Sequence, residues 1–377
     1  MATEIRGFEA VRNAAKDFET YSSDLQGDRD VRDYRQLPLE ADPPRHTMFR
    51  EALVPIFSAE AISPKAEKFE ALASELITAL SSRGGGDICT ELALPYVIGC
   101  LTIIYNRPQD YEEWLSWGPD VWTAEAYSKG ELTAEAHRAH RERNFSGGNQ
   151  RDGRMLQAYL DRVFDQAEKN LNLQVEPVDI WDEICRLEVG GQKVNRQEMQ
   201  GIANVLLAGG RDTVIKLVTG ICWHLINSPE DRDYLKQDEA VFTDSIAELI
   251  RFLSPLAKME RVLANQKHLP DDQRDPDSYV LLSFVSANYD KTVWQDPETI
   301  DLRRPRRAHL GFGFGRHACL GMRITDTEAK AFLRALLKNW PNWEFDGEPA
   351  IEWVTDGENE EAVKVIDRFN ELKVKVA

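Results

Sequence analysis

The sequence predicts a protein that is mainly α with small β-sheets, folded as a single domain over residues 1–377. Three observations predict this. Helical hydrophobic spacing dominates the chain, strand patterns are short and late, and no Pro- or Ser-rich linker divides it. At roughly 150 residues per domain, length alone would favour two or three domains. Because no linker is evident, we expect one large domain whose core needs no disulfide or metal.

Seven segments repeat apolar residues at every third or fourth position, and we expect each to be a helix. They are Phe8–Phe18, Thr47–Phe57, Lys65–Leu80, Leu156–Leu171, Asp179–Leu187, Arg196–Ile226 and Thr325–Trp340. Short β-rich runs predict strands at Lys258–Leu263, Tyr279–Val285 and Leu372–Val376.

Charge and composition argue against several classes of protein. The chain has 46 Lys and Arg against 64 Asp and Glu, a net charge of −18 that repels phosphate backbones and anionic lipids, so we expect no nucleic-acid partner. The longest uncharged apolar stretch, Leu92–Tyr105, has 14 residues, whereas a membrane-spanning helix needs about 20, so no membrane anchor is expected. Five scattered cysteines without a CxxC pair, and a start unlike a secretory leader, predict a cytoplasmic protein.

The most unusual segment is glycine-rich and reads FGFGRHACLG over Phe312–Gly321. One interpretation is a loop with a buried free cysteine, the common environment of a lone cysteine. A second takes Gly313, Gly315 and Ala318 as a dinucleotide-binding fingerprint. That motif requires an apolar strand before it, and here an arginine-rich stretch precedes it. The nucleotide interpretation is therefore weak.

A third interpretation makes Cys319 a metal ligand at the start of a helix. The N–H groups of the next three residues and the helix dipole would stabilise its thiolate. Glycines at 313, 315 and 321 place no Cβ in the way of a planar cofactor. A single cysteine without a second thiolate or a histidine cluster fits neither zinc nor an iron–sulfur cluster, but it fits a haem iron with one axial thiolate.

The same segment matches every fixed position of FGxGxHxCxG, the haem-binding signature of the cytochromes P450, and the chain resembles that family over nearly its whole length. The resemblance implies the cytochrome P450 fold and a haem b whose iron is bound by Cys319. It also implies cofactor contacts from Phe312, Gly313, His317 and Gly321.

Upstream, the stretch AGGRDTV at 208–214 resembles the oxygen-binding part of the family's long central helix. Two glycines inside a helix cost about 1 kcal/mol each relative to alanine, so they indicate a purpose, such as a groove beside the haem at Gly209. Thr213 can bend the helix and, with Asp212, forms an acid–alcohol pair that can carry protons for O–O cleavage. The alternative is close helix packing with a solvated aspartate. Arg211 lies about 200° from Gly209 around the helix and should point away from the haem.

Two further sets of residues follow from the resemblance. Glu248 and Arg251 match its ExxR pair, with Arg304 as the second arginine, a network that can pin the cysteine loop. Haem propionates need cationic or donor partners, and the matching positions are His46, Arg50, Arg261 and His309. The walls of the substrate pocket are expected at Val205, Ala208, Gly209, Leu256 and Ala257.

The activity implied is a monooxygenase that inserts one atom of O₂ into a small, largely apolar organic substrate. Electrons would come from a ferredoxin or flavodoxin-type donor with its reductase, because no flavin or iron–sulfur module follows the haem motif. Five arginines near the thiolate loop could steer that acidic partner, namely Arg303, Arg306, Arg307, Arg316 and Arg323. The alternatives are a peroxide-driven or non-oxidative haem–thiolate enzyme, and a non-enzymatic haem carrier or sensor.

The chain departs from the family at its start. The family has a helix and two strands before the helix expected at Phe8–Phe18, whereas only a short lead-in is present here. We therefore expect the N-terminal helix and first strands to be shortened or missing. The segment Asp24–Ala41, which covers the substrate in the family, is also compact.

Overall fold

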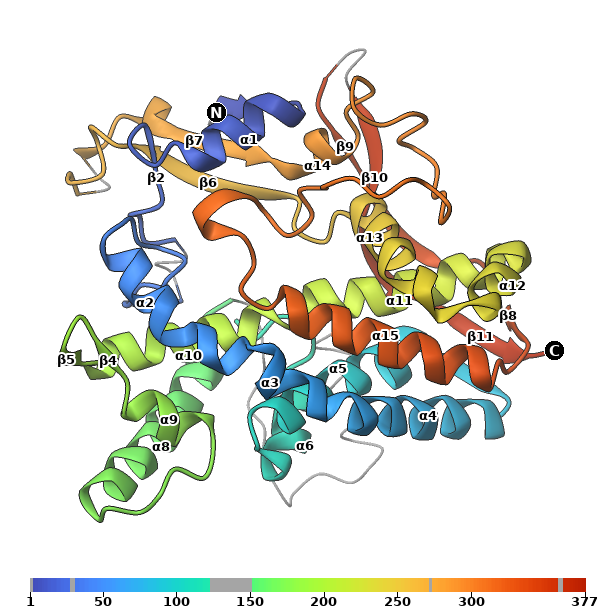
Figure 1. The fold of residues 1–377 in the computed structure, drawn as a ribbon, viewed down its shortest axis with the longest axis horizontal. Helices are drawn as coiled ribbons and strands as arrows, with labels where there is room; N and C mark the ends of the chain where they lie inside the picture. The colour runs from blue at the N-terminus through green and yellow to red at the C-terminus, as the bar shows by residue number, and fades with distance from the viewer. Residues whose placement is uncertain (1–2, 28–30, 123–150, 271–272, 359–361) are drawn as a thin grey trace.

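The computed structural model describes residues 3–27, 31–122, 151–270, 273–358 and 362–377. Helices make up most of this part of the chain and the strands form small sheets, which confirms the predicted fold class. A layer of strands with α1 and α14 lies at one end of the molecule, and the larger helical part lies below it (Figure 1).

The described helices include the predicted ones and others that the sequence analysis did not predict, of which α13 with 12 residues and α5 with 11 are the longest. Their bounds are α1 Phe8–Lys16, α2 Arg45–Leu53, α3 Ala59–Ile62, α4 Ala66–Ser82, α5 Leu94–Ile104, α6 Tyr111–Ser116, α8 Arg154–Asn172, α9 Ile180–Cys185, α10 Arg196–Gly209, α11 Asp212–Asn227, α12 Pro229–Gln237, α13 Phe242–Leu253, α14 Phe284–Asn288 and α15 Met322–Lys338.

The largest mixed sheet has the strand order β1-β7-β6-β2, with β1 parallel to β7 and the other pairs antiparallel. Its strands are β1 Thr3–Ile5, β2 Tyr21–Ser22, β6 Lys258–Leu263 and β7 Tyr279–Ser283. The short lead-in before α1 thus forms a strand of this sheet. The strand predicted at Tyr279–Val285 ends two residues early, because the Ser283 hydroxyl caps α14 by accepting the N–H of Ser286.

Three smaller sheets complete the described strands. Strands β9 (Ala350–Asp356) and β10 (Val363–Glu371) form an antiparallel pair that the sequence analysis did not predict. A three-stranded sheet has the order β3-β11-β8, from Gly85–Asp87, Lys373–Val376 and Trp343–Phe345. Strands β4 (Glu188–Val189) and β5 (Gln192–Lys193) form a short hairpin.

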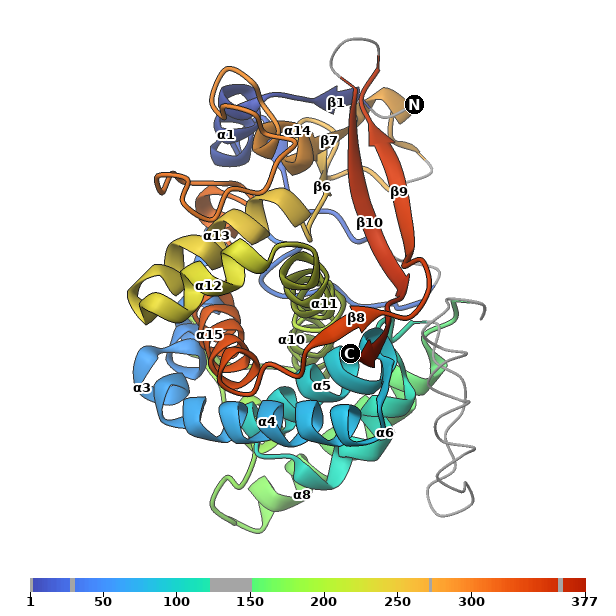
Figure 2. The same ribbon diagram turned by 90° about the vertical axis from the view of Figure 1, so that its right-hand side faces the viewer.

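The main core surrounds α10 and α11, which Figure 2 views nearly end-on among α4, α5, α13 and α15. Helix α5 carries no charged residue and is buried along almost its whole length, as expected for a helix that is apolar all round. Helix α10 starts at a capping box, in which Asn195 Oδ1 accepts the Glu198 N–H and the Glu198 carboxylate accepts the Asn195 N–H.

The single helix predicted over Arg196–Ile226 is wrong, because the structure has two helices that break at Gly210 and Arg211. The Thr213 hydroxyl donates to the carbonyl oxygen of Gly209 at 3.3 Å, which competes with the regular backbone bond. The Arg211 side chain also leaves the helix to reach carbonyl groups near α6. Glycine and side-chain competition together account for the break.

In the described part of the chain, no helix is both long enough and apolar enough to cross a membrane.

Candidate functional site

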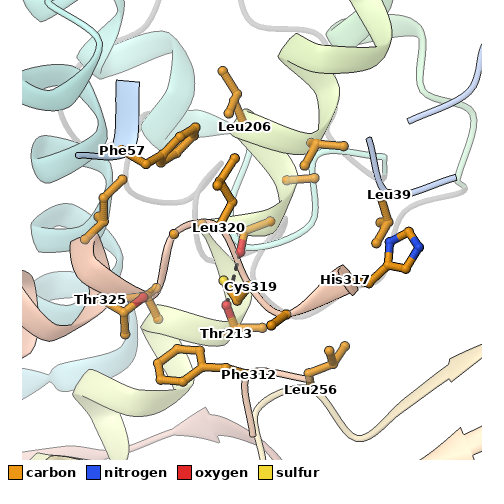
Figure 3. Close-up of a pocket in the computed structure, with 18 of the residues that line it drawn as sticks. Leu39, Phe57, Leu206, Thr213, Leu256, Phe312, His317, Cys319, Leu320 and Thr325 are labelled. Atoms are coloured by element: carbon orange, nitrogen blue, oxygen red, sulfur yellow. Dashed lines mark hydrogen bonds between the residues drawn. The ribbon is translucent and has the colours of Figure 1, made fainter. Parts of the chain in front are cut away.

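A cavity of about 520 Å³ lies between the break of the central helix and the loop that leads into α15. Most of the predicted site residues line it, namely His46, Arg50, Val205, Ala208, Gly209, Asp212, Thr213, Leu256, Phe312, His317, Cys319 and Gly321. Figure 3 shows Cys319 and Thr213 at the centre of this cavity, with apolar side chains such as Phe57, Leu206 and Leu256 around them.

Four predicted wall or cofactor residues are not among those that line the cavity, namely Ala257, Arg261, His309 and Gly313. Ala257 follows Leu256 into an extended segment, where neighbouring side chains face opposite ways, and its carbonyl accepts the Val285 N–H at 3.2 Å. Gly313 acts in the backbone of the loop instead, at a φ of 68° that suits glycine.

The loop before α15 presents Cys319 to the cavity. Gly315 has a φ of 71°, and a Cβ there would lie 2.8 Å from the carbonyl oxygen of Ala15 in α1, so only glycine lets the loop pack on that helix. The Cys319 N–H donates to the Phe312 carbonyl oxygen at 2.8 Å and closes the loop. The backbone that carries the sulfur is therefore held in place.

The Cys319 side chain is exposed and lines the cavity. Desolvation by the surrounding protein atoms raises the pKa of its thiol, while the N–H groups of Gly321 and Met322 and the charge of Arg50 act in the opposite direction. These are groups that stabilise a thiolate, as expected at the start of α15. The N–H of Leu320, the third donor expected from the sequence, is not among the groups that act on the sulfur.

A cluster of basic side chains, comprising His46, Arg50, Arg261, Arg316 and His317, lies beside the cavity. The rings of His46 and His317 are 4.3 Å apart between centroids. Burial, followed by the charges of neighbouring arginines, lowers the pKa of His46 to about 4 and that of His317 to about 2. Burial also lowers the pKa of Arg261 to about 10.

Three buried ring nitrogens of this basic cluster lack acceptors among the described residues, whereas Arg261 Nη1 donates to the Glu260 carbonyl oxygen at 2.7 Å. Neither ring nitrogen of His46 is hydrogen-bonded, although the Arg316 carbonyl group lies near that ring, and His317 Nε2 also has no partner. Buried donors without partners are costly. Their concentration fits an anionic group with several oxygens, such as the two propionates of a haem.

The structure does not bring His309 into this cluster. His309 lies instead beside Arg251, Glu248 and Arg306, and its Nδ1 accepts the Gly311 N–H at 3.1 Å. The histidine that lies beside His46 is instead His317, two residues before the cysteine in the motif. The charges of Arg251 and Glu248 act on the His309 ring, which lies two residues before the glycine whose N–H it accepts.

The helix break places Asp212 and Thr213 on the cavity. The Thr213 N–H donates to Asp212 Oδ1 at 2.8 Å, and burial raises the pKa of this carboxyl to about 6. The Asp212 side chain is exposed to the cavity, and the surrounding protein atoms are the cause of its raised pKa. Gly209 faces open space, since no atom lies within 4 Å of a Cβ placed there. Because no side chain covers the backbone here, a flat cofactor or a small molecule can approach the helix closely.

Glu248, Arg251 and Arg304 form the network expected from their spacing. Arg251 binds the Glu248 carboxylate with two hydrogen bonds of 2.8 Å, and Arg304 Nε donates to Glu248 Oε1 at 3.1 Å. Arg251 also donates to the backbone carbonyl of Asn288, whose side chain accepts the Leu310 N–H at 2.7 Å. The network thus holds the segment that enters the cysteine loop.

Arg211 points away from the cavity, as expected. It is fully buried and donates through Nε to the Gly118 carbonyl oxygen at 2.6 Å and through Nη2 to that of Trp114. These carbonyls lie at the C-terminal end of α6, where backbone acceptors lack helical partners. Arg211 therefore ties the helix break to α6.

The sequence analysis missed Glu328, which lines the cavity from α15. Its side chain is fully buried, neither carboxylate oxygen has a hydrogen-bond partner, and burial raises its pKa to about 8. The available signal was an acidic residue on the apolar stripe of a helix, one turn after Thr325.

Comparison with known proteins agrees with this geometry. Residues 148–352, more than half of the chain, match the family model described as Cytochrome P450. The chain belongs to the cytochrome P450 family. It is 28% identical to the cyclomarin C epoxidase CymV of Salinispora arenicola over 317 residues. The aligned region covers 84% of this chain and 76% of that protein. The chain is 25% identical to a steroid C26-monooxygenase of Mycobacterium tuberculosis, over 89% of this chain and 86% of that protein.

The solved structures agree with the sequence relatives. A structure described as a carbohydrate active P450 aligns with a TM-score of 0.79 and 27% identity, over 99% of this chain and 92% of that chain. This P450 is therefore a haem–thiolate monooxygenase with a haem-iron cofactor, which rules against the dinucleotide fingerprint and the non-enzymatic haem carrier.

Proposed function

We propose that this P450 holds a haem b with Cys319 as the iron ligand. It would oxidise a small, largely apolar organic molecule in the cavity beside Gly209. The observation that carries this proposal is the arrangement around one cavity: a lone cysteine and an acid–alcohol pair line it, and a basic cluster with unpartnered ring nitrogens in His46 and His317 lies beside it. The bound haem iron would supply the activation of O₂. The protein's own residues would bind the haem, hold the substrate, exclude water and deliver protons.

Each group of residues has a separate task in this proposal. His46, Arg50, Arg261 and His317 would bind the propionates and so fix the orientation of the haem. The Glu248 network would hold the cysteine loop in place. Leu256 and the face of α10 that carries Val205 and Ala208 would exclude water and hold the substrate, in keeping with their position in the cavity wall.

Proton delivery would fall to Asp212 and Thr213. With a pKa of about 6, the Asp212 carboxyl can hold and release a proton near neutral pH, which is what a proton carrier requires. The Thr213 hydroxyl lies next to it and faces the cavity. This pair favours O₂-dependent turnover over a peroxide-driven reaction, which needs less proton delivery.

The absorbance spectrum of the reduced carbon monoxide complex tests the thiolate ligand. Wild-type protein should show the red-shifted Soret band typical of sulfur ligation, and Cys319→Ser should lose it because the ligand becomes oxygen. Cys185→Ser, a buried cysteine away from the cavity, is the matched control and should keep the band. A colourless wild-type protein after haem supplementation would overturn the proposal.

We further propose a cytoplasmic location and an acidic ferredoxin or flavodoxin-type electron donor. All five cysteines are free, as is usual in a reducing compartment. Exposed arginines precede the cysteine loop. Arg306 is 64% exposed and lies 3.7 Å from Asp244, and Arg303 pairs with Asp231 at 2.5 Å. Because Arg303 is the more closely paired of these two arginines, Arg306 and its neighbour Arg307 are the residues to test.

Stopped-flow reduction by a surrogate ferredoxin tests this surface. The double variant Arg306→Glu/Arg307→Glu should slow reduction at least about tenfold at low salt and weaken its salt dependence, because steering by charge acts on the association rate. Arg154→Glu reverses an exposed arginine that also pairs with an acid, on α8, and should leave the rate unchanged. Equal effects of both changes would contradict a specific docking surface.

A further inference from the structure

The cavity wall contributed by residues 36–39 carries a single amide, Gln36, beside Leu37, Pro38 and Leu39. The other polar groups on the described cavity wall have roles already assigned, or lie with Glu328 on α15, the helix that follows Cys319. The Tyr105 hydroxyl is bonded to the Leu206 carbonyl oxygen at 3.1 Å. Gln36 is thus a polar group in an apolar wall that the reaction itself does not use.

The backbone of Gln36 is held by a buried acidic residue. The Gln36 N–H donates to Glu40 Oε2 at 2.7 Å, and the Glu40 N–H donates to the Gln36 carbonyl oxygen at 2.7 Å. Glu40 is paired with the buried Arg32 at 2.5 Å. An arginine–carboxylate pair with additional hydrogen bonds holds its groups in a defined geometry. The turn that presents Gln36 is therefore rigid.

The same turn is packed directly onto α10. The Leu37 N–H donates to the Gly201 carbonyl oxygen at 3.4 Å, and a Cβ on Gly201 would lie 2.0 Å from the Arg35 carbonyl oxygen. Glycine is therefore required at 201 for the turn to approach the helix. Helix α10 also supplies the cavity wall at Val205 and Gly209. This one helix therefore fixes the position of Gln36 relative to the part of the cavity beside Gly209.

The amide group itself is oriented by a buried partner. Gln36 Nε2 donates to Asn204 Oδ1 at 2.5 Å, and Asn204, which is fully buried, donates through Nδ2 to the Tyr34 hydroxyl at 3.3 Å. One of the two N–H donors of the Gln36 amide is thereby used. Its carbonyl oxygen, Oε1, is left as an acceptor on a half-buried side chain that borders the cavity.

We propose that Gln36 determines substrate specificity, by accepting a hydrogen bond from a hydroxyl group on an otherwise apolar substrate. This rests on the proposed function of the cavity and deepens it. The apolar frame would pack on Leu39, Val205 and Leu256, and the hydroxyl would end at Gln36 Oε1. A site built to bond a hydroxyl rejects an analogue without one, because the acceptor is then left unpaired.

The test is spectral titration of the haem-loaded protein with matched ligands. The probes are cyclooctanol, cyclooctanone and cyclooctane, and a 3-hydroxysteroid with its 3-keto and 3-deoxy forms, so that a small and a large frame are both covered. In at least one series the alcohol should bind about tenfold more tightly than its ketone and its hydrocarbon, since a single hydrogen bond to a partly exposed acceptor has this order of effect.

Two variants of Gln36 test whether this residue causes the preference for the alcohol. Gln36→Met keeps the shape, removes the acceptor and should abolish the preference for the alcohol. Gln36→Glu keeps acceptor oxygens and should retain part of it. Leu39→Met alters the neighbouring wall without touching the amide and should leave the preference unchanged. The reduced carbon monoxide spectrum of each variant shows that the haem site is intact.

The outcomes separate this inference from the proposed function. A normal Soret band with no alcohol preference in either series, or with no spectral shift at all, overturns the role of Gln36 and leaves the haem–thiolate proposal standing. Tighter binding of the ketones, or a preference that survives in Gln36→Met, also overturns it. Loss of the thiolate band in wild-type protein overturns both.

Discussion

The hydroxyl of Thr213 donates a hydrogen bond to the carbonyl oxygen of Gly209, 3.3 Å away, at the point where the central helix breaks. The bond links the residue proposed to carry protons with the residue whose missing side chain leaves the cavity open. One local distortion of the helix therefore creates the space for a small molecule and places the hydroxyl beside it.

Removing only the hydroxyl of Thr213 should uncouple the enzyme. In Thr213→Val the side chain keeps its shape but can no longer hold a proton, and product per NADPH should fall at least about tenfold while hydrogen peroxide rises, because a positioned proton donor is worth about 10²–10⁴ in rate. Product and peroxide are measured with a substrate found by spectral titration. Thr213→Ser keeps the hydroxyl and should stay near wild type, and equal coupling in the two variants would refute the role.

Haem retention should depend on His317 and not on His309. His317→Ala removes a donor from the basic cluster, and hydrogen bonds to charged groups are worth about 1.5–3 kcal/mol, so haem transfer to apomyoglobin should be about tenfold faster or more. His309→Ala leaves this cluster whole and should transfer haem at nearly the wild-type rate. The reverse order would show that the sequence-based assignment of His309 is right.

Breaking the buried pair of Glu248 and Arg251 should be far more damaging than breaking an exposed pair. Arg251→Ala leaves a buried carboxylate without its main partner, which costs about 3–5 kcal/mol, and we expect little haem-loaded protein to accumulate. Lys291 and Glu298 form an exposed pair at 3.3 Å. Lys291→Ala should change the free energy of unfolding by no more than about 1 kcal/mol. Haem content and Tm are the measurements, and similar losses in both variants would contradict the network's role.

Glu328 should make stability depend on pH with a defined sign. Burial raises its pKa from 4.5 to about 8, so the folded protein keeps this proton while the unfolded chain releases it. Stability is then lost as the pH rises from about 4.5 to 8, by an upper limit of about 5 kcal/mol.

Glu328→Gln removes this titration. Its Tm should be close to that of the wild type near pH 5 and higher than that of the wild type at pH 8. Glu75→Gln, an exposed glutamate on α4, should show no such trend. A Tm difference between Glu328→Gln and wild type that does not change with pH would show that the Glu328 carboxyl is ionised in the folded state.

The sequence predicts those features that neighbouring residues determine. Hydrophobic spacing locates strand β6 to the residue and α4 to within two residues at each end, because burial of one face of a regular element requires that spacing. The motif spacing identifies Cys319, since the loop, its glycines and the following helix are contiguous in the chain. Glu248, Arg251 and Arg304 were found in the same way, through their order relative to that motif.

Contacts between distant segments decided the rest. Whether His309 or His317 joins His46 depends on where the loop turns, and the break at Arg211 depends on carbonyl groups of α6 almost a hundred residues earlier. The isolation of Glu328 and the orientation of Gln36 by Asn204 likewise exist only once the helices are packed. Spacing along a chain specifies which face of an element is buried, whereas the groups that meet across that face are selected by the packing itself.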